Sequence, residues 1–254
     1  MPPSNPPSRG NFRPPSRSGS TDIKKKMETA WDAIMKKTPR GSDPAIPKPT
    51  QRALYQAALW LHSELTKKQV QYYFVGGFAC INVGMTARTT ADIDIAVPNG
   101  AVGYGTLLDL FASGPFTKHG DNYYFYVAQT GAFVEVDGII AGWQAFPELT
   151  KARLIKVGNP ANPEMQLTFL EPAGLLRLKL SSWANETRRN SPKRAGDMSD
   201  MQSIRDLLVS EAQGTKKKID FYKTLDPQMK KGLKDWIAEF KDGDRWSMLD
   251  PSIR

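Results

Sequence analysis

The chain has 254 residues, of which 40% are hydrophobic and 24% charged, an ordinary composition for a globular protein with a sizeable core. It carries one cysteine and two histidines, which excludes an intramolecular disulfide and argues against a histidine-rich metal site or a Ser-His-Asp triad. No apolar run reaches membrane length, so we expect neither a membrane span nor secretion. We expect a cytoplasmic location, with a nuclear one left open.

The net charge of +9 is concentrated at the N-terminus, where residues 1–50 hold ten basic and four acidic side chains. Residues 1–20 are rich in Pro, Ser, Gly and Arg and bury too little apolar surface to offset the entropy of ordering, so we expect disorder there. An amphipathic piece with Trp31 follows, which could dock or stay free. We assign residues 1–49 as a basic tail and linker, whose charge fits an acidic partner such as a nucleic acid.

The globular part is expected to begin with a helix for which Thr50 is the N-cap. The next elements are expected to be a strand at 72–75, a Gly76-Gly77 turn, a short helix at about 78–83 and a strand at 92–97. Further helices are expected at 106–111 and 147–154, and further strands at 123–127, 132–140 and 165–170.

From residue 171 the pattern becomes helical, with a last helix at about 229–240 and an irregular ending. This order predicts an α/β (α+β) fold in which a mixed sheet is flanked by helices. We expect the sheet in a core domain at 50–170 and a helical C-terminal segment at 171–254.

Acidic residues mark two of the predicted strands. The period of two in the strand at 92–97 places Asp92 and Asp94 on one face and apolar side chains on the other. Two carboxylates on one face repel each other unless a positive charge lies between them. If the strand that carries Asp137 pairs nearby, three carboxylates converge. Such a set suits two Mg²⁺ ions that hold a triphosphate and activate a hydroxyl for in-line attack.

Gly76 and Gly77 stand between a strand and a helix. Glycine lets the backbone approach a phosphate closely, and the free N–H groups at a helix start favour an anion. The side chains of Arg88, Lys179, Arg189 and Lys193 are available to offset the charge of a phosphate. Other interpretations stay open, since the two glycines could be only a turn, Arg88 could cap the strand entry or pair with Asp92, and Lys179 could extend from the core edge.

The order of these features resembles the nucleotidyltransferase superfamily, which has the DNA polymerase β-like fold. The resemblance rests on Gly76-Gly77, a helix, the run Arg88-x-Thr90-x-Asp92-Ile93-Asp94-Ile95, and the later Asp137. Within the superfamily the chain is most similar to the minimal nucleotidyltransferases of the AbiEii-toxin type. The helical part of those proteins is matched by Lys179, by Arg188 and Arg189, and by the run Lys-Arg-Ala-Gly-Asp-Met-Ser-Asp at 193–200. The resemblance covers about residues 70–210.

The resemblance implies transfer of a nucleoside monophosphate from an NTP to a hydroxyl acceptor, with release of pyrophosphate and with Mg²⁺ or Mn²⁺ as cofactor. It implies that Asp92 and Asp94 bind both metals, and that Asp137 binds the catalytic metal and helps to deprotonate the acceptor. Glu135 adds a fourth acid and leaves the number of metals open. The implied nucleotide-binding residues are Gly76, Gly77, Arg88, Thr90, Lys179 and Lys193.

The acceptor stays open among a tRNA or other RNA 3′ end, a protein hydroxyl and a small molecule, and the pattern does not indicate an oligomeric state. The alternative function is that of a catalytically silent protein with the same fold, which binds a nucleic acid or a protein partner through its basic tail.

Overall fold

The computed structural model of the chain describes residues 20–39, 42, 44–83, 89–158, 162, 165–215 and 220–253. The disorder expected for the start of the chain concerns residues 1–19, which lie outside the described residues. No helix in the described ranges is both long and apolar enough to cross a lipid bilayer.

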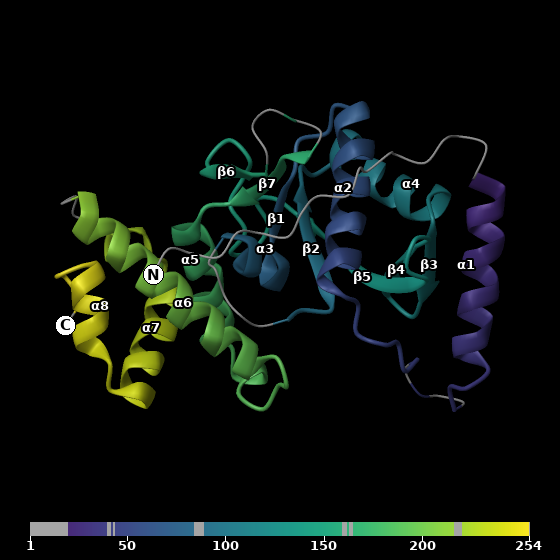
Figure 1. The fold of residues 1–254 in the computed structure, drawn as a ribbon. Helices are drawn as coiled ribbons and strands as arrows, with labels where there is room; N and C mark the ends of the chain where they lie inside the picture. Colours follow the sequence, from purple (N-terminus) through teal and green to yellow (C-terminus); the bar gives the residue numbers. More distant parts are fainter. Residues whose placement is uncertain are drawn as a thin grey trace, which may run out of the picture.

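Within the described residues, seven strands form one mixed sheet in the order β3-β4-β5-β2-β1-β7-β6 (Figure 1). Strand β1 runs parallel to β7, and β2 runs parallel to β5, while the other neighbours are antiparallel. The mixed sheet expected from the sequence is therefore confirmed. The strands are β1 (Tyr73–Val75), β2 (Asp92–Val97), β3 (Phe116–His119), β4 (Asn122–Val127), β5 (Ala132–Ile140), β6 (Leu154–Val157) and β7 (Leu167–Leu170).

Helices flank this sheet and make up the C-terminal part of the chain. They are α1 (Ser20–Met35), α2 (Gln51–Lys67), α3 (Gly76–Val83), the π-helical turn η2 (Ala101–Gly105), α4 (Thr106–Ser113), α5 (Pro172–Trp183), the 3₁₀ turn η4 (Glu186–Arg188), α6 (Arg194–Thr215), the 3₁₀ turn η5 (Tyr222–Thr224), α7 (Pro227–Phe240) and α8 (Gly243–Leu249). Thr50 caps α2 as predicted, because its hydroxyl accepts a hydrogen bond from the Ala53 amide at 3.2 Å.

Two helices pack on opposite faces of β4 and β5. Trp60 of α2 lies against Phe125 on one face, with ring centroids 5.1 Å apart. Trp31 of α1 lies against Tyr124 and Phe133, at 5.3 and 5.2 Å, on the other face. The faces differ because successive side chains of a strand alternate. The amphipathic N-terminal piece is therefore docked as helix α1, beside β3 and β4 (Figure 1).

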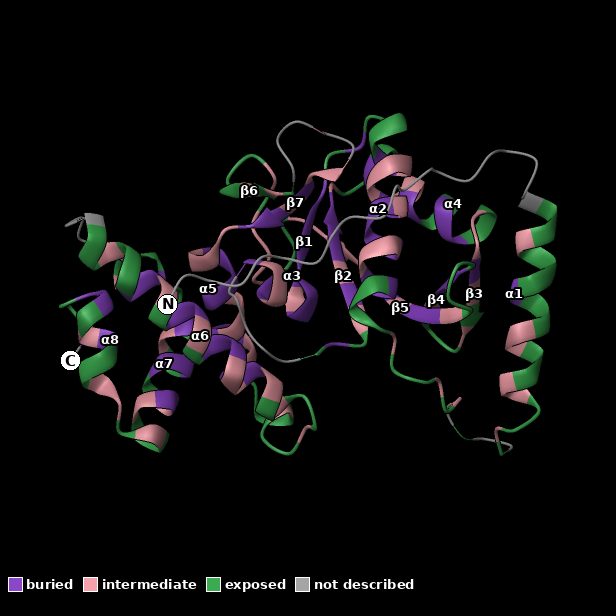
Figure 2. Ribbon diagram, in the orientation of Figure 1, coloured by how far each residue is buried: buried purple, intermediate pink, exposed green. Residues whose placement is uncertain are grey.

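The C-terminal helices α5 to α8 pack against one another beside the sheet (Figure 1). Four large aromatic side chains join α5, α7 and α8, with ring centroids 4.3 to 6.4 Å apart: Trp183, Trp236, Phe240 and Trp246. One apolar core runs from Ala53 in α2 through the sheet to Ile253, and Figure 2 shows buried residues in both parts. The division of the chain at residue 170 stays a prediction.

Two local predictions outside the acidic site are wrong. The helix expected at 147–154 is a single turn, closed by the amides of Lys151 and Ala152 on the Glu148 carbonyl, and Leu154 then begins β6. Pairing with β7 outcompetes helix extension there, because Ile155 can lie beside the buried Phe169 in the sheet. The ending expected to be irregular contains α8, whose Trp246 and Leu249 are buried against the helices before it.

Candidate active site

The acidic residues meet where β2 and β5 run side by side. Asp94 pairs with Asp137, and Asp92 pairs with Glu135, in a parallel register. Residues that are directly paired on neighbouring strands point to the same face of the sheet. All four carboxylates therefore share one face. For Asp92, Asp94 and Asp137 this is the convergence that the sequence predicted on condition that the two strands pair. Tyr124 of β4 pairs with Glu135, so α1 packs on this same face.

Gly76 brings the start of α3 against Asp94. Its φ of +64° is left-handed, and a Cβ atom built on it would lie 1.6 Å from Oδ2 of Asp94. Only glycine allows the backbone to approach the carboxylate this closely. Gly76 and Gly77 form the first turn of α3, and not a separate turn before it, so the free N–H groups of the helix start lie at the acidic site.

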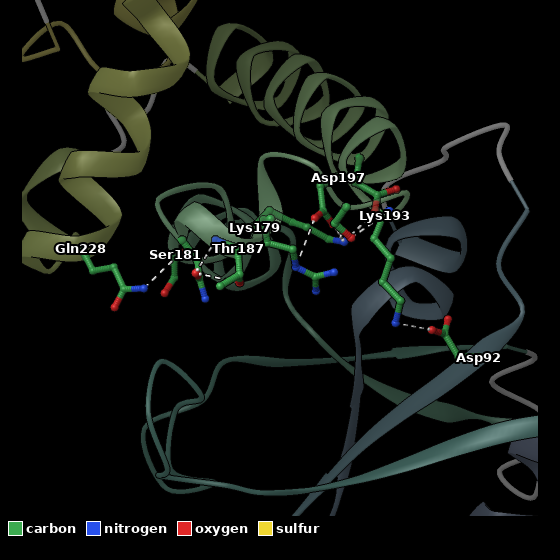
Figure 3. Close-up of polar contacts among 11 residues, drawn as sticks. Asp92, Lys179, Ser181, Thr187, Lys193, Asp197 and Gln228 are labelled. Carbon is green, nitrogen blue, oxygen red and sulfur yellow. Dashed lines mark hydrogen bonds and ion pairs between the residues drawn. The ribbon is translucent and has the colours of Figure 1, made fainter. Parts of the chain in front are cut away.

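Thr90 and Lys193 hold the carboxylate of Asp92. The hydroxyl of Thr90 donates to Oδ1 at 2.5 Å. Nζ of Lys193 donates to Oδ2 at 3.3 Å (Figure 3). Burial acts to raise the pKa of Asp92, but these two contacts outweigh it and lower the pKa below its ordinary value. Lys193 lies in the connection to α6, so its ion pair joins the C-terminal helices to the sheet.

The pKa values of Asp94 and Asp137 shift in the opposite direction, above their ordinary value. Burial and the nearby charges of Asp92 and Asp137 raise the pKa of Asp94 to about 7. Burial and the charge of Asp92 also raise the pKa of Asp137. Both shifts mean that the site disfavours several negative charges at once when no cation offsets them.

Lys179 is held by two aspartates of α6. Its Nζ lies 2.6 Å from Asp197 (Figure 3) and 2.9 Å from Asp200. Nε of Arg188 lies 4.0 Å from Asp197. The lysine side chain is 11% exposed, and that of Asp200 is fully buried. Desolvation acts to lower the pKa of Lys179, but nearby thiol and carboxylate charges raise it above its ordinary value. The cluster ties α5 to α6 beside the acidic face.

These groups surround a cleft of about 780 Å³ between the sheet and the C-terminal helices. Most of the predicted site residues line it, namely Gly76, Gly77, Thr90, Asp92, Asp94, Lys179 and Lys193. Asp137 is paired with Asp94 but is not part of the lining. Arg88 lies outside the described residues. Arg189, considered as a phosphate-binding cation, instead lies 3.8 Å from Asp235 of α7 and is not part of this lining.

Some lining residues were not predicted as part of the site. Lys48 belongs to the segment expected to be a linker, and Phe146 follows β5. No local pattern distinguishes Lys48 from the other lysines of the N-terminal region, because its position depends on how the chain crosses the sheet.

The carboxylates suit a divalent cation by their chemistry, since hard cations such as Mg²⁺ prefer oxygen ligands. The raised pKa values of Asp94 and Asp137 also favour a cation that would offset the negative charges of these carboxylates. Across the described part of the chain, however, no three His, Cys, Asp or Glu side chains are gathered tightly enough to form a ready metal site. Asp92 is instead held by Thr90 and Lys193.

No protein-family model matches the sequence, and a search of curated proteins finds no matching sequence. Among solved structures, the chain is similar to an antigenic nucleotidyltransferase-like protein from Paracoccidioides brasiliensis, with a TM-score of 0.60 and 18% identity over 78% of this chain and 92% of that one. The chain therefore has the nucleotidyltransferase fold that the sequence predicted. A second match is the antibiotic-resistance factor ANT(2'')-Ia, with a TM-score of 0.41 and 10% identity over 75% of this chain and 93% of that one. This second likeness is too low to support an argument.

Proposed function

We propose that the protein is a metal-dependent nucleotidyltransferase, which moves a nucleoside monophosphate from an NTP to a hydroxyl acceptor and releases pyrophosphate. The observation that carries the proposal is the parallel register of Asp94 and Asp137, next to Asp92 and to the glycine start of α3. The three aspartates and the start of α3 each have a role in the proposed reaction. A silent protein that binds partners only through its tail has no need of this arrangement.

In the proposed reaction, an oxygen of the acceptor attacks the α-phosphorus, and the bond from that phosphorus to the bridging oxygen of the leaving pyrophosphate breaks. The N–H groups at the start of α3 and the ammonium of Lys193 would hold the phosphates. Asp137 would accept the proton of the attacking hydroxyl. Asp92 and Asp94 would hold a divalent cation such as Mg²⁺ or Mn²⁺, which when bound would neutralise the carboxylates and polarise the phosphate.

The fold alone does not choose the acceptor, because function depends on the site and not on the fold. A tRNA or other RNA 3′ end, a protein hydroxyl and a small molecule are all candidate acceptors. A closer kinship with the AbiEii-type enzymes likewise stays a prediction. So do the phosphate contacts proposed for Arg88, Thr90 and Lys179. Lys179 would have to share its ammonium between a phosphate and the two aspartates that hold it.

The test is incubation of the purified chain with each of the four α-labelled NTPs, with Mg²⁺ or Mn²⁺. Total RNA, total protein and a set of small polyhydroxyl compounds would serve as acceptors. Asp92→Asn and Asp94→Asn keep the side-chain shape and remove the charge, and the exposed Asp121→Asn serves as the matched control. We expect label on one acceptor class with the wild type and with the control, and none with the site variants.

Transfer that survives both site variants would contradict the assignment of the carboxylates. Metal-dependent cleavage of the NTP with no labelled acceptor, in every pool, would point to a hydrolase. Absence of both NTP binding and turnover would favour the silent alternative.

A further inference from the structure

The N-terminal segment crosses the same sheet face as the carboxylates. Its helix α1 rests on that face through Met27, which is 4% exposed, and through Trp31. Ile46 packs against the same aromatic cluster, made by Tyr124, Tyr126 and Phe133. The segment then reaches Thr50, where α2 begins on the opposite face. Within residues 44–50, Lys48 therefore reaches the acidic site between two anchors, the contact of Ile46 with the aromatic cluster and the start of α2 at Thr50.

Lys48 lies between these anchors and lines the cleft. It is two residues past Ile46 and two before the cap of α2, so its backbone is held on either side. In the same lining stand Thr89 to Asp92 from the approach to β2, and Gly76 and Gly77 from α3. Lys48, which lies in the segment expected from its composition to be a linker, is thus part of the wall of the cleft.

The charges of the cleft distinguish Lys48 from the other cations. Among the described residues, the cationic side chains that line the cleft are Lys48, Lys179, Arg188 and Lys193. Lys179 is paired with two aspartates, Arg188 lies near one of them, and Lys193 is paired with Asp92. Lys48 has no acidic partner among the described residues. An anion in the cleft would meet its ammonium without breaking an existing ion pair.

We propose that Lys48 binds the triphosphate of the nucleotide, and that α1 is the element that positions it. The inference rests on the proposed function, because it takes the ligand of the cleft to be an NTP. The competing interpretation is that Lys48 is a solvated lysine at the rim and that α1 only covers the aromatic cluster. The two interpretations differ in what they predict for triphosphate binding when α1 is released from the sheet.

The test measures binding of inorganic triphosphate with Mg²⁺ by titration calorimetry, because this probe carries the phosphates without depending on the base. The variants are Lys48→Ala, Lys48→Arg and Trp31→Ala, and Lys36→Ala is the matched control because that exposed lysine lies on the same segment outside the cleft. Circular dichroism and thermal unfolding verify that each variant is folded. Loss of one ammonium–phosphate contact is expected to weaken binding about tenfold.

We expect Lys48→Ala and Trp31→Ala each to weaken binding, Lys48→Arg to retain most of it, and Lys36→Ala to leave it unchanged. The double variant Trp31→Ala, Lys48→Ala should bind no more weakly than Lys48→Ala, because undocking α1 already removes the lysine from the cleft. Equal binding by Lys48→Ala and the wild type would overturn the assignment. Additive losses in the double variant would overturn the positioning role of α1. Failure of the wild type to bind inorganic triphosphate while it still binds an NTP would overturn the assignment of Lys48 as a triphosphate contact, whereas failure to bind either ligand would overturn the proposed function.

Discussion

Lys193 reaches Asp92 across 101 positions of the chain and places its Nζ 3.3 Å from Oδ2 of that carboxylate. The contact puts a positive charge on the carboxylate that begins β2. It also connects the C-terminal helices to the sheet across the cleft (Figure 3). A phosphate or a cation that enters the cleft would compete for one of the two partners.

Replacement of Lys193 should therefore affect binding far more than stability. The lysine side chain is 60% exposed, and exposed ion pairs contribute only about 0–1 kcal/mol to the free energy of unfolding. We expect Lys193→Gln to change the urea midpoint little and to weaken NTP binding about tenfold, through loss of a phosphate contact. Calorimetric titration beside urea unfolding tests both parts. A large loss of stability with unchanged NTP affinity would show that the contact between Lys193 and Asp92 stabilises the fold and has no part in nucleotide binding.

Substitution of Gly76 should lower the free energy of unfolding because an added Cβ atom would overlap Asp94. Gly120 allows a comparison in which that overlap is absent. Gly120 has a similar φ of +58°, but a Cβ atom added there would have nothing within 4 Å, whereas at Gly76 that atom would overlap the Asp94 carboxylate. Alanine in the left-handed region costs about 1–2 kcal/mol by itself, which is what we expect for Gly120→Ala. Gly76→Ala should lose clearly more in urea unfolding and should abolish nucleotidyl transfer. Equal losses at the two positions would contradict the close approach.

The ion cluster of Lys179 should matter for stability. Lys179→Met would leave Asp197 and Asp200 buried without their main counter-charge, and removal of one partner of a buried ion pair costs about 3–5 kcal/mol. The matched control is Lys234→Met, on the exposed side of α7. Urea unfolding followed by circular dichroism provides the measurement. A change in Lys179→Met as small as in the control would mean that the aspartates are solvated.

The raised pKa of Asp94 predicts a pH dependence with a definite sign. Its folded-state pKa of about 7 lies above the ordinary value of 3.8, so the folded chain holds this proton more tightly than the unfolded chain. Its contribution to stability is complete below the ordinary value and is lost as the pH rises through the folded-state pKa. Mg²⁺ competes with that proton, so we expect it to raise the melting temperature more at about pH 8 than at about pH 5.5.

Asp94→Asn is the control for this pH dependence, because the amide has no titrating proton. In that variant, the effect of Mg²⁺ on the melting temperature should be small and nearly independent of pH. An equal Mg²⁺ effect at both pH values in the wild type would contradict the link to Asp94.

Sequence patterns predicted several residues that line the cleft, because the features that mark them are local. The alternation of Asp92, Ile93, Asp94 and Ile95 predicted both the bounds of β2 and the polar face, and Thr50 marked the start of α2. The run at 132–140 matched β5 at both ends. The order of glycines and acids indicated the nucleotidyltransferase fold before any contact was known. The likeness of the structure to a nucleotidyltransferase-like protein agrees with that fold.

Where the deciding contact was distant in sequence, the prediction failed or stayed open. One helical turn at residues 148–152 resembled a helix, but pairing with β7 ended it. The short α8 forms because Trp246 and Leu249 have helices to pack against. Lys179 was expected at a core edge or on a phosphate, and nothing local showed that Asp197 and Asp200 would enclose it.

The sequence by itself thus determined which side chains share a strand face, where the main helices and strands of the core lie, and which fold their order resembles. These properties follow from backbone periodicity and capping, which act within a few residues. Only the tertiary structure decided that Asp94 stands opposite Asp137, that Lys193 holds Asp92, and that Lys48 reaches the cleft. Those relationships depend on strand register and on packing between segments far apart in the chain, which no local pattern specifies.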